Sequence, residues 1–310
     1  MNRYFREISV ATALGIILVA LAIFAPAFYQ PQPLLTLITS QVAPTLVVAC
    51  GMALVIITRQ IDISVGSTFA ICGVCGGLML SHGYPIALAL PASILLGAVM
   101  GAFNGGLVAG LGLPSIVVTL ATMVTWREAL RWLREGVYVI IGSGGQWFGL
   151  SQSAGQWTII SIALALMLLL ALAMRHLAAG RFVYAVGTDA EAARLAGIRP
   201  RLVTFLTFVF IGALTGLAAM MSAVQSPQVD PTAGAGLELR TIAAVVVGGV
   251  SISGGRGNLW GVLVGLLLLS SINPALTYLG VSAFWEKAIQ GAIILLAVVA
   301  DGVRNRKGNR

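Results

Sequence analysis

The chain carries few groups that could do catalytic chemistry. Its only two histidines are His82, in a Ser-His-Gly-Tyr-Pro turn, and His176, beside an arginine. A phosphate-binding P-loop needs a lysine followed by serine or threonine, but Lys287 precedes alanine and Lys307 precedes glycine. Metal-dependent and triad-type catalysis are therefore disfavoured, and any nucleotide energy would have to come from a partner.

A second group of polar residues interrupts apolar stretches. Such side chains are costly inside a membrane unless they are paired or hydrated. Arg59 and Asp62 are i, i+3 neighbours that could pair with each other, whereas the other members are uncharged hydroxyls and amides, which suit a polyhydroxylated solute better than an ion. The candidates for a translocation pathway are Arg59, Asp62, Ser64, Asn104, Thr119, Thr122 and Asn273. Each could instead make an ordinary hydrogen bond between helices, so both interpretations stay open.

Residues 187–200 form a polar island between long apolar segments. Thr188 and Glu191 have capping-box spacing, in which each side chain bonds the other's backbone N–H. Strong helix formers follow, Gly197 is placed to end the helix in a left-handed conformation, and Pro200 prevents resumption. The prediction is a helix of about two turns that is steadied by something it docks against. Its candidate docking residues are Thr188, Asp189, Glu191, Ala192, Ala193, Arg194, Leu195 and Gly197.

The elements that must position these residues are membrane-spanning helices. The chain is 58% hydrophobic and 9% charged, with a mean hydropathy of +0.98. Apolar windows of about 18 to 23 residues recur from end to end, each long enough to cross a hydrocarbon core of roughly 30 Å. The three cysteines lie in apolar stretches, and the Cys-Gly-Val-Cys spacing lacks the βαβ pattern of a redox motif. The sequence predicts an all-α, polytopic helix bundle in which 1–310 form one transmembrane domain.

Ten spans are expected. Their approximate bounds are 8–29, 37–57, 63–80, 86–108, 115–134, 157–174, 202–224, 241–252, 259–279 and 283–300, with 126–134 amphipathic. An arrangement of eight crossings with re-entrant pieces has the same parity and remains an alternative.

The basic residues are distributed unevenly among the connections. With a cytoplasmic N-terminus, thirteen of the eighteen lysines and arginines lie inside and five lie outside. The outer five are Arg127, Arg131, Arg134, Arg240 and Lys287. The positive-inside rule then predicts that both termini and the 187–200 island are cytoplasmic. The same rule explains the net charge of +8, so the charge does not indicate nucleic-acid binding.

Glycine falls repeatedly at four-residue spacing. Gly97, Gly101 and Gly105 form a continuous small-residue ridge, and similar pairs are 73/77, 106/110, 212/216 and 261/265. Such ridges let helix backbones approach closely where lipid gives no hydrophobic drive. They predict a tightly packed bundle.

Four blocks of the chain resemble one family. Gln60-Ile-Asp-Ile-Ser-Val-Gly-Ser67 resembles the G-I-D-L-S-V-G-S motif of the ribose/galactose/autoinducer-2 group of ABC-importer permeases. Phe103-Asn-Gly105 with 114–120 is similar to its F-N-G…P-x-F-I-x-T-L segment. The blocks 187–198 and 236–257 resemble its coupling loop and its G-x-E-L…G-G-x-G segment. The departures are Gln60 for a usual glycine and Asp189 where asparagine is common.

The resemblance implies a permease of the bacterial inner membrane that carries no cofactor. It would work with a cytoplasmic ATP-binding subunit that holds ATP and Mg²⁺, a periplasmic or lipoprotein sugar-binding protein, and a second identical or paralogous permease. The 187–200 loop would couple it to the ATPase. Within the group, the segments 146–157 and 284–290 look most like rhamnose permeases, with autoinducer-2 permeases close behind.

Two other classes of function are alternatives to an ABC-importer permease. An ion-coupled secondary transporter or channel would have the same composition, and it would work without ATP. A membrane-embedded enzyme would need a catalytic cluster, which the two histidines do not suggest.

Overall fold

The computed structural model describes residues 5–278, 280–282, 285–293, 295 and 299. The basic residues beyond residue 300 and seven of the eighteen residues of the predicted tenth span lie outside these residues. Residues 285–293 of that span are helical.

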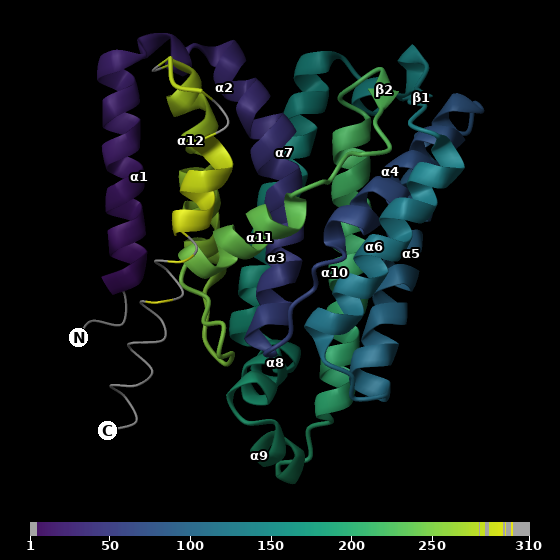
Figure 1. The fold of residues 1–310 in the computed structure, drawn as a ribbon, viewed down its shortest axis with the longest axis vertical. Coiled ribbons are helices and arrows are strands. Elements are labelled where there is room, and N and C mark those ends of the chain that lie inside the picture. Colours follow the sequence, from purple (N-terminus) through teal and green to yellow (C-terminus); the bar gives the residue numbers. More distant parts are fainter. Residues whose placement is uncertain (1–4, 279, 283–284, 294, 296–298, 300–310) are drawn as a thin grey trace.

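Helices dominate the described chain, and most run along its long axis (Figure 1). They are α1 (Phe5–Phe24), α2 (Pro31–Leu37), α3 (Ala43–Ile57), α4 (Val65–Ser81), α5 (Ile86–Gly105), α6 (Ser115–Arg134), α7 (Gln152–His176), α8 (Ala178–Thr188), α9 (Ala190–Leu195), α10 (Pro200–Ala223), α11 (Leu237–Val247) and α12 (Leu259–Tyr278). Short 3-10 helices cover Pro26–Tyr29 and Ser143–Gly149, and π-helical turns cover Ile38–Val42 and Gly106–Gly110. A two-residue antiparallel ribbon pairs β1 (Val139–Ile140) with β2 (Gln228–Val229).

Several helices are long enough to span a bilayer. In the part of the chain that the structure describes, five stretches are both long and apolar enough: Pro31–Ile57, Ile86–Gly110, Gln152–His176, Pro200–Ala223 and Leu259–Tyr278. Shorter apolar helices cover Val10–Phe24 and Val65–Ser81. The fold is therefore a polytopic membrane bundle, as predicted.

The predicted span at 241–252 does not form as a full helix. α11 has 11 residues, which at about 1.5 Å each cover roughly half of a hydrocarbon core. It lies obliquely at mid-height in Figure 1. The chain still passes from the ribbon, where β2 pairs with β1, to the opposite end, where the Gly255 N–H donates to the Ile57 carbonyl at 2.9 Å. This crossing is a broken one, completed by loops on both sides of α11.

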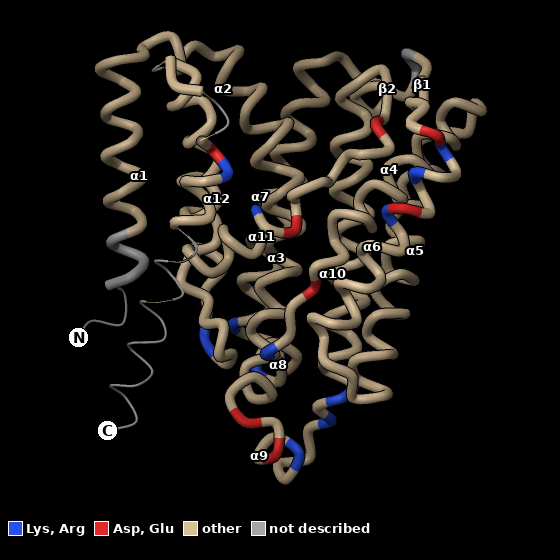
Figure 2. The backbone as a smooth tube through the Cα atoms, in the orientation of Figure 1, with Lys and Arg blue, Asp and Glu red and all other residues tan. Residues whose placement is uncertain are grey.

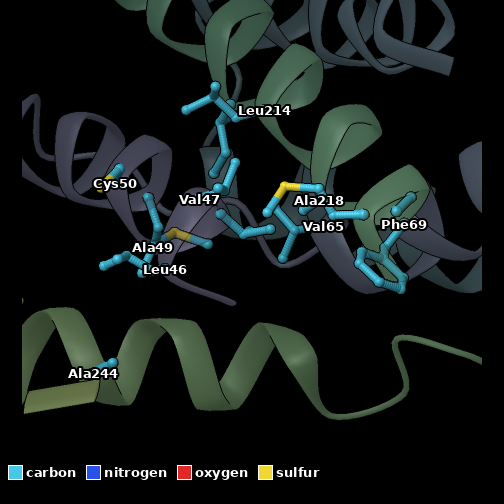
Figure 3. Close-up of a cluster of buried hydrophobic side chains, with 14 of the residues drawn as sticks. Leu46, Val47, Ala49, Cys50, Val65, Phe69, Leu214, Ala218 and Ala244 are labelled. Carbon is cyan, nitrogen blue, oxygen red and sulfur yellow. The ribbon is translucent and has the colours of Figure 1, made fainter. Parts of the chain in front are cut away.

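α3 is the centre of the bundle. All fifteen of its residues are buried. Figure 3 shows Leu46, Val47 and Ala49 of α3 among side chains from α4, α10 and α11. α10 packs against α3, α4 and α5. A helix without a polar face suits this position because it meets other helices on every side.

The predicted glycine ridges of α5 and α10 pack against each other. A Cβ added at Gly97 would overlap the carbonyl oxygen of Gly212, and one at Gly101 would overlap that of Phe208. The pair at 106/110 is different, since an added Cβ at either position meets nothing within 4 Å in the described chain. Ridge packing is thus confirmed for α5 and α10, and it does not extend to 106/110. Cys50 and Cys72 are buried, Cys75 is half-buried, and all three are free thiols, as expected of structural cysteines.

Candidate functional site

The polar island begins at the last two residues of α8 and contains α9, and these two helices form a compact projection at one end of the bundle (Figure 1). Asp189 separates the two helices with an extended backbone at φ −158°. Its Oδ1 accepts hydrogen bonds from the N–H groups of Glu191 at 2.9 Å and Ala192 at 3.0 Å. Asp189 is therefore the N-cap of α9. These bonds, from Ala192 first and then Glu191, lower the pKa of the Asp189 carboxyl.

The predicted capping box of Thr188 and Glu191 is wrong. Thr188 is the last residue of α8, and its hydroxyl donates to the Tyr184 carbonyl at 2.8 Å. Glu191 pairs with Arg194, with Oε1 and Nη2 2.5 Å apart. The physical reason is that two consecutive residues could cap. The Asp189 carboxylate reaches the free amides of α9, while Thr188 completes the preceding helix.

The predicted end of the helix is confirmed. Gly197 has φ +83°, and its N–H donates to the Arg194 carbonyl at 3.0 Å. The N–H of Ile198 donates to the Ala193 carbonyl, also at 3.0 Å, which completes a Schellman motif. Pro200 does more than block resumption: it is the first residue of α10, where its missing N–H is not needed.

The outer face of α9 combines one apolar side chain with charges. Leu195 is 80% exposed, while Ala193 is buried against the bundle. The ion pair of Glu191 with Arg194 is about two-thirds exposed, so it adds little to stability. In Figure 2 basic residues gather around α8, α9 and the start of α10. The projection therefore presents to a partner one apolar side chain, Leu195, surrounded by charged residues.

The predicted pairing of Arg59 with Asp62 is also wrong. The Arg59 side chain bonds α8, while Asp62 Oδ1 accepts from the backbone N–H of Ser64 at 2.9 Å and from its hydroxyl at 2.6 Å. The i, i+3 spacing brings side chains together only on a helix. Residues 60–63 are not helical, and Arg59 has φ +63°.

Several other pathway candidates meet at this break between α3 and α4. The Ser64 hydroxyl accepts from Asn104 Nδ2 at 2.8 Å, which links α5 to the start of α4. Asp62, Ser64 and Asn104 are all at most 2% exposed. The three residues therefore form a buried chain of hydrogen bonds.

α6 supplies the remaining bonds at the break. Thr119 Oγ1 accepts from the Ile63 N–H at 3.1 Å, and Ser115 Oγ accepts from the Ile61 N–H at 3.2 Å. Thr122 lies one turn farther along α6, and its hydroxyl donates to the Thr119 carbonyl. An extended backbone inside a membrane protein needs such partners because lipid offers none. Ser115 was missed, although its place at a helix start after Pro114 is a signal for a polar role.

Asn273 lies in a separate cluster on α12. Its Nδ2 donates to Glu286 Oε2 at 2.5 Å. Glu286 Oε1 also accepts from Arg240 at 3.1 Å and from Gln290 at 2.9 Å. The sequence reasoning assigned Arg240 to an outer loop and missed this role. The isolated carboxylate in a long apolar stretch was the available signal.

A second ion pair holds the N-terminal end of α11. Arg127 Nη2 of α6 lies 3.5 Å from Glu238 Oε1, and the Glu238 side chain is 9% exposed. Because Glu238 and Arg240 both lie near the start of α11, this helix is tied to α6 by one residue and to the 285–293 segment by the other. Among the described residues, no group of three His, Cys, Asp or Glu side chains could hold a metal ion.

Residues 34–298 match the family model described as branched-chain amino acid transport system, permease component. The chain belongs to this family. Similar proteins include the autoinducer 2 import system permease protein LsrC of Salmonella typhimurium, 36% identical over 97% of this chain and 88% of the relative. The proteins of the same name from Enterobacter sp. strain 638 and Escherichia coli O9:H4 are each 34% identical over 96% of this chain and 87% of the relative. No solved structure matches the chain significantly.

Membership has direct consequences. The chain is a multi-pass, non-catalytic permease subunit of a bacterial ABC importer in the inner membrane. Subunits of this family carry no cofactor, since ATP is hydrolysed on a partner ATPase. The secondary-transporter and membrane-enzyme alternatives are set aside, and the preference for rhamnose permeases finds no support among these relatives.

Proposed function

We propose that this chain moves a small polyhydroxylated solute into the cytoplasm, with autoinducer 2 favoured over rhamnose. The three relatives described above are named for autoinducer 2 import. The buried amide and hydroxyl groups at the α3–α4 break are consistent with a neutral, hydroxyl-rich cargo.

The α9 helix is proposed as the coupling element for a cytoplasmic ATP-binding subunit. The observation that carries this proposal is a six-residue helix fixed at both ends that leaves Leu195 80% exposed. So short a helix adds little to the bundle, yet it is capped by Asp189 and ended by Gly197. A large exposed apolar side chain on a rigid projection suits a pocket on a partner.

A cytoplasmic ATP-binding subunit on α9 also fixes the orientation of the chain in the membrane. α9 faces the cytoplasm, the N-terminal end of α1 lies toward the same side, and the β1–β2 end faces the periplasmic binding protein. A second permease, identical or paralogous, completes the transmembrane part. Asp62, Ser64, Asn104 and Thr119 hold the break between α3 and α4 by hydrogen bonds, and Thr122 supports Thr119 from within α6.

Cysteine labelling tests the orientation in a background that lacks the native cysteines. Leu195→Cys should resist an impermeant thiol reagent added to intact cells. Ser151→Cys and Gln228→Cys, both at exposed positions of the opposite end, should react. Labelling of position 195 from outside would refute the proposed topology. Gly187 cannot serve as a second labelling site on the α9 side, because a side chain there would overlap the Ile57 carbonyl.

Substitution of Leu195 tests the docking role. Leu195→Asp should release the ATP-binding subunit during purification from the membrane, while the permease itself inserts normally. Leu111→Asp is the control, since Leu111 is 70% exposed in the link between α5 and α6. Equal recovery of the ATPase subunit with both variants would mean that α9 is no docking element.

The solute is tested by uptake. Cells that depend on this importer should accumulate autoinducer 2 more readily than rhamnose or ribose, and depletion of ATP should abolish uptake. Preferential uptake of rhamnose would overturn the substrate assignment and leave the importer class intact.

A further inference from the structure

Three segments that are far apart in the chain meet beside α9. They are the end of α3 with the α3–α4 break, the end of α8, and the glycine-rich loop 248–258 that precedes α12. Each segment is hydrogen-bonded to the other two, so the junction is a closed ring.

Arg59 makes the first side of the ring. Its Nε donates to the Gly187 carbonyl at 2.6 Å, and its Nη2 donates to the Thr188 carbonyl at 2.5 Å. These are the last carbonyls of α8, which have no partner within the helix itself. A cation at this end is also favoured by the helix dipole. The backbone of Arg59, at φ +63°, is in the left-handed region, which is unusual for a residue other than glycine.

The other two sides come from the glycine-rich loop. The Gly255 N–H donates to the Ile57 carbonyl of α3 at 2.9 Å. The Tyr184 hydroxyl of α8 donates to the Gly257 carbonyl at 2.8 Å. The end of α3, the end of α8 and the glycine-rich loop are thus each hydrogen-bonded to the other two.

The ring is packed backbone against backbone. A Cβ at Gly187 would overlap the Ile57 carbonyl oxygen, and one at Gly254 would overlap Cγ of Arg59. A Cβ at Gly255 would lie 2.6 Å from Thr188 Oγ1. Because the three backbones approach this closely at the glycines, a displacement of α8 has little slack to absorb it.

We propose that Arg59 is the positioning residue that passes movement of the α8–α9 projection to the α3–α4 break. This inference rests on the proposed function of α9. When the ATP-binding subunit moves α9, the guanidinium held by the last carbonyls of α8 carries the chain reversal at residues 58–63 with it.

Beyond Arg59 the movement reaches the transmembrane part. Ser115 and Thr119 hold Ile61 and Ile63 against α6. Asp62 bonds Ser64 directly before α4 begins. A shift at Arg59 therefore changes how α4 lies against α6.

Three variants separate the side chain from the backbone. Arg59→Gly removes the guanidinium and relieves the left-handed strain, and this relief offsets part of the cost of the two lost hydrogen bonds. Arg59→Ala removes the donors and keeps the strain. Arg59→Lys keeps one charge but loses the two-pronged geometry. Arg175→Ala, an exposed arginine at the end of α7, is the charge control.

The assay is the reconstituted importer. We expect Arg59→Gly and Arg59→Ala to insert normally and to retain the ATPase subunit and unstimulated ATP hydrolysis with its KM for ATP. Stimulation of hydrolysis by the loaded binding protein and solute uptake should both fall about tenfold, within the usual range of coupling between sites. Arg59→Lys should recover part of the loss, and Arg175→Ala should match the wild type.

The outcomes distinguish this inference from the function on which it rests. Wild-type stimulation and uptake in Arg59→Gly would overturn it, and so would loss of the ATPase subunit, because Arg59 would then shape the docking site instead of passing on its movement. If Leu195→Asp retains the ATPase subunit and full stimulation, the proposed role of α9 fails. If the Arg59 variants behave as wild type while Leu195→Asp loses the ATPase subunit, the role of α9 stands, and its movement reaches the transmembrane helices by contacts other than Arg59.

Discussion

Gly97 of α5 and Gly212 of α10 face each other with no space for a side chain between them. A Cβ added at either residue would overlap the carbonyl oxygen of the other. The same arrangement continues one turn away, where a Cβ at Gly216 would overlap the Ser93 carbonyl oxygen. The backbones of α5 and α10 are therefore in direct contact along this seam, as in other small-residue helix interfaces in membranes.

This seam leads to the first prediction. Gly97→Ala and Gly212→Ala should each lower the thermal stability of the purified protein, because overpacking of this kind costs about 1–3 kcal/mol. Gly106→Ala is the control. Position 106 is helical and open, so alanine there should raise stability by roughly 0.5–1 kcal/mol. Equal melting temperatures for all three variants would contradict the packing described here.

The second prediction concerns the cap of α9. Asp189→Ala removes the acceptor for two backbone N–H groups, so it should fray α9 and reduce binding-protein-stimulated hydrolysis several-fold. Asp189→Asn should retain most of the activity, since asparagine caps equally well. Thr188→Ala removes only the bond to Tyr184 and should have the smallest effect. A larger loss of stimulated hydrolysis in Thr188→Ala than in Asp189→Ala would instead support Thr188 as the capping residue.

The third prediction is the pH dependence of that cap. The pKa of Asp189 is lowered in the folded state, so its stabilising effect is complete above the unfolded pKa of about 3.9 and is lost as the pH falls through the lower, folded value. Amide-exchange protection of Glu191 and Ala192 should be constant from about pH 5 to 8 and fall only below about pH 4. In Asp189→Asn this acid-induced loss should be absent. A loss of protection centred near neutral pH would assign the effect to another group.

The fourth prediction addresses the cluster around Glu286. Glu286→Ala leaves Arg240, Asn273 and Gln290 without their shared acceptor. The side chains of Arg240 and Glu286 are 30% and 13% exposed. The loss of stability should therefore lie below the roughly 3–5 kcal/mol of a fully buried pair. Glu135→Ala, at an exposed position after α6, should change the melting temperature little. Unchanged stability in Glu286→Ala would mean that the cluster is hydrated and contributes nothing.

The sequence was most informative where a local rule decides the structure. The four-residue spacing of Gly97 and Gly101 is enough to place a flat stripe on a helix, and Gly197 ends α9 because left-handed backbone favours glycine. Hydropathy identified the bundle for the same reason, since the length of an apolar stretch is a local property.

Prediction failed where the backbone leaves the helix. The pairing of Arg59 with Asp62 assumed helical spacing, but residues 60–63 are not helical, and the N–H groups of Ile61 and Ile63 donate to side chains of α6. The stretch 241–252 was counted among the spans because its residues are apolar. The helix there, α11, starts earlier, at Leu237, and its Glu238 and Arg240 pair with residues of distant segments. Such contacts depend on the tertiary arrangement, which no local pattern encodes.

The ring beside α9 also sets an order on biosynthesis. Ile57 and Arg59 leave the ribosome early, but Gly255 and Gly257, which close the ring, are made about two hundred residues later. Until then the end of α3 and the Tyr184 hydroxyl of α8 lack these partners, and buried polar groups without partners are unfavourable. The α8–α9 projection therefore acquires its final shape only after the chain beyond α11 has been made.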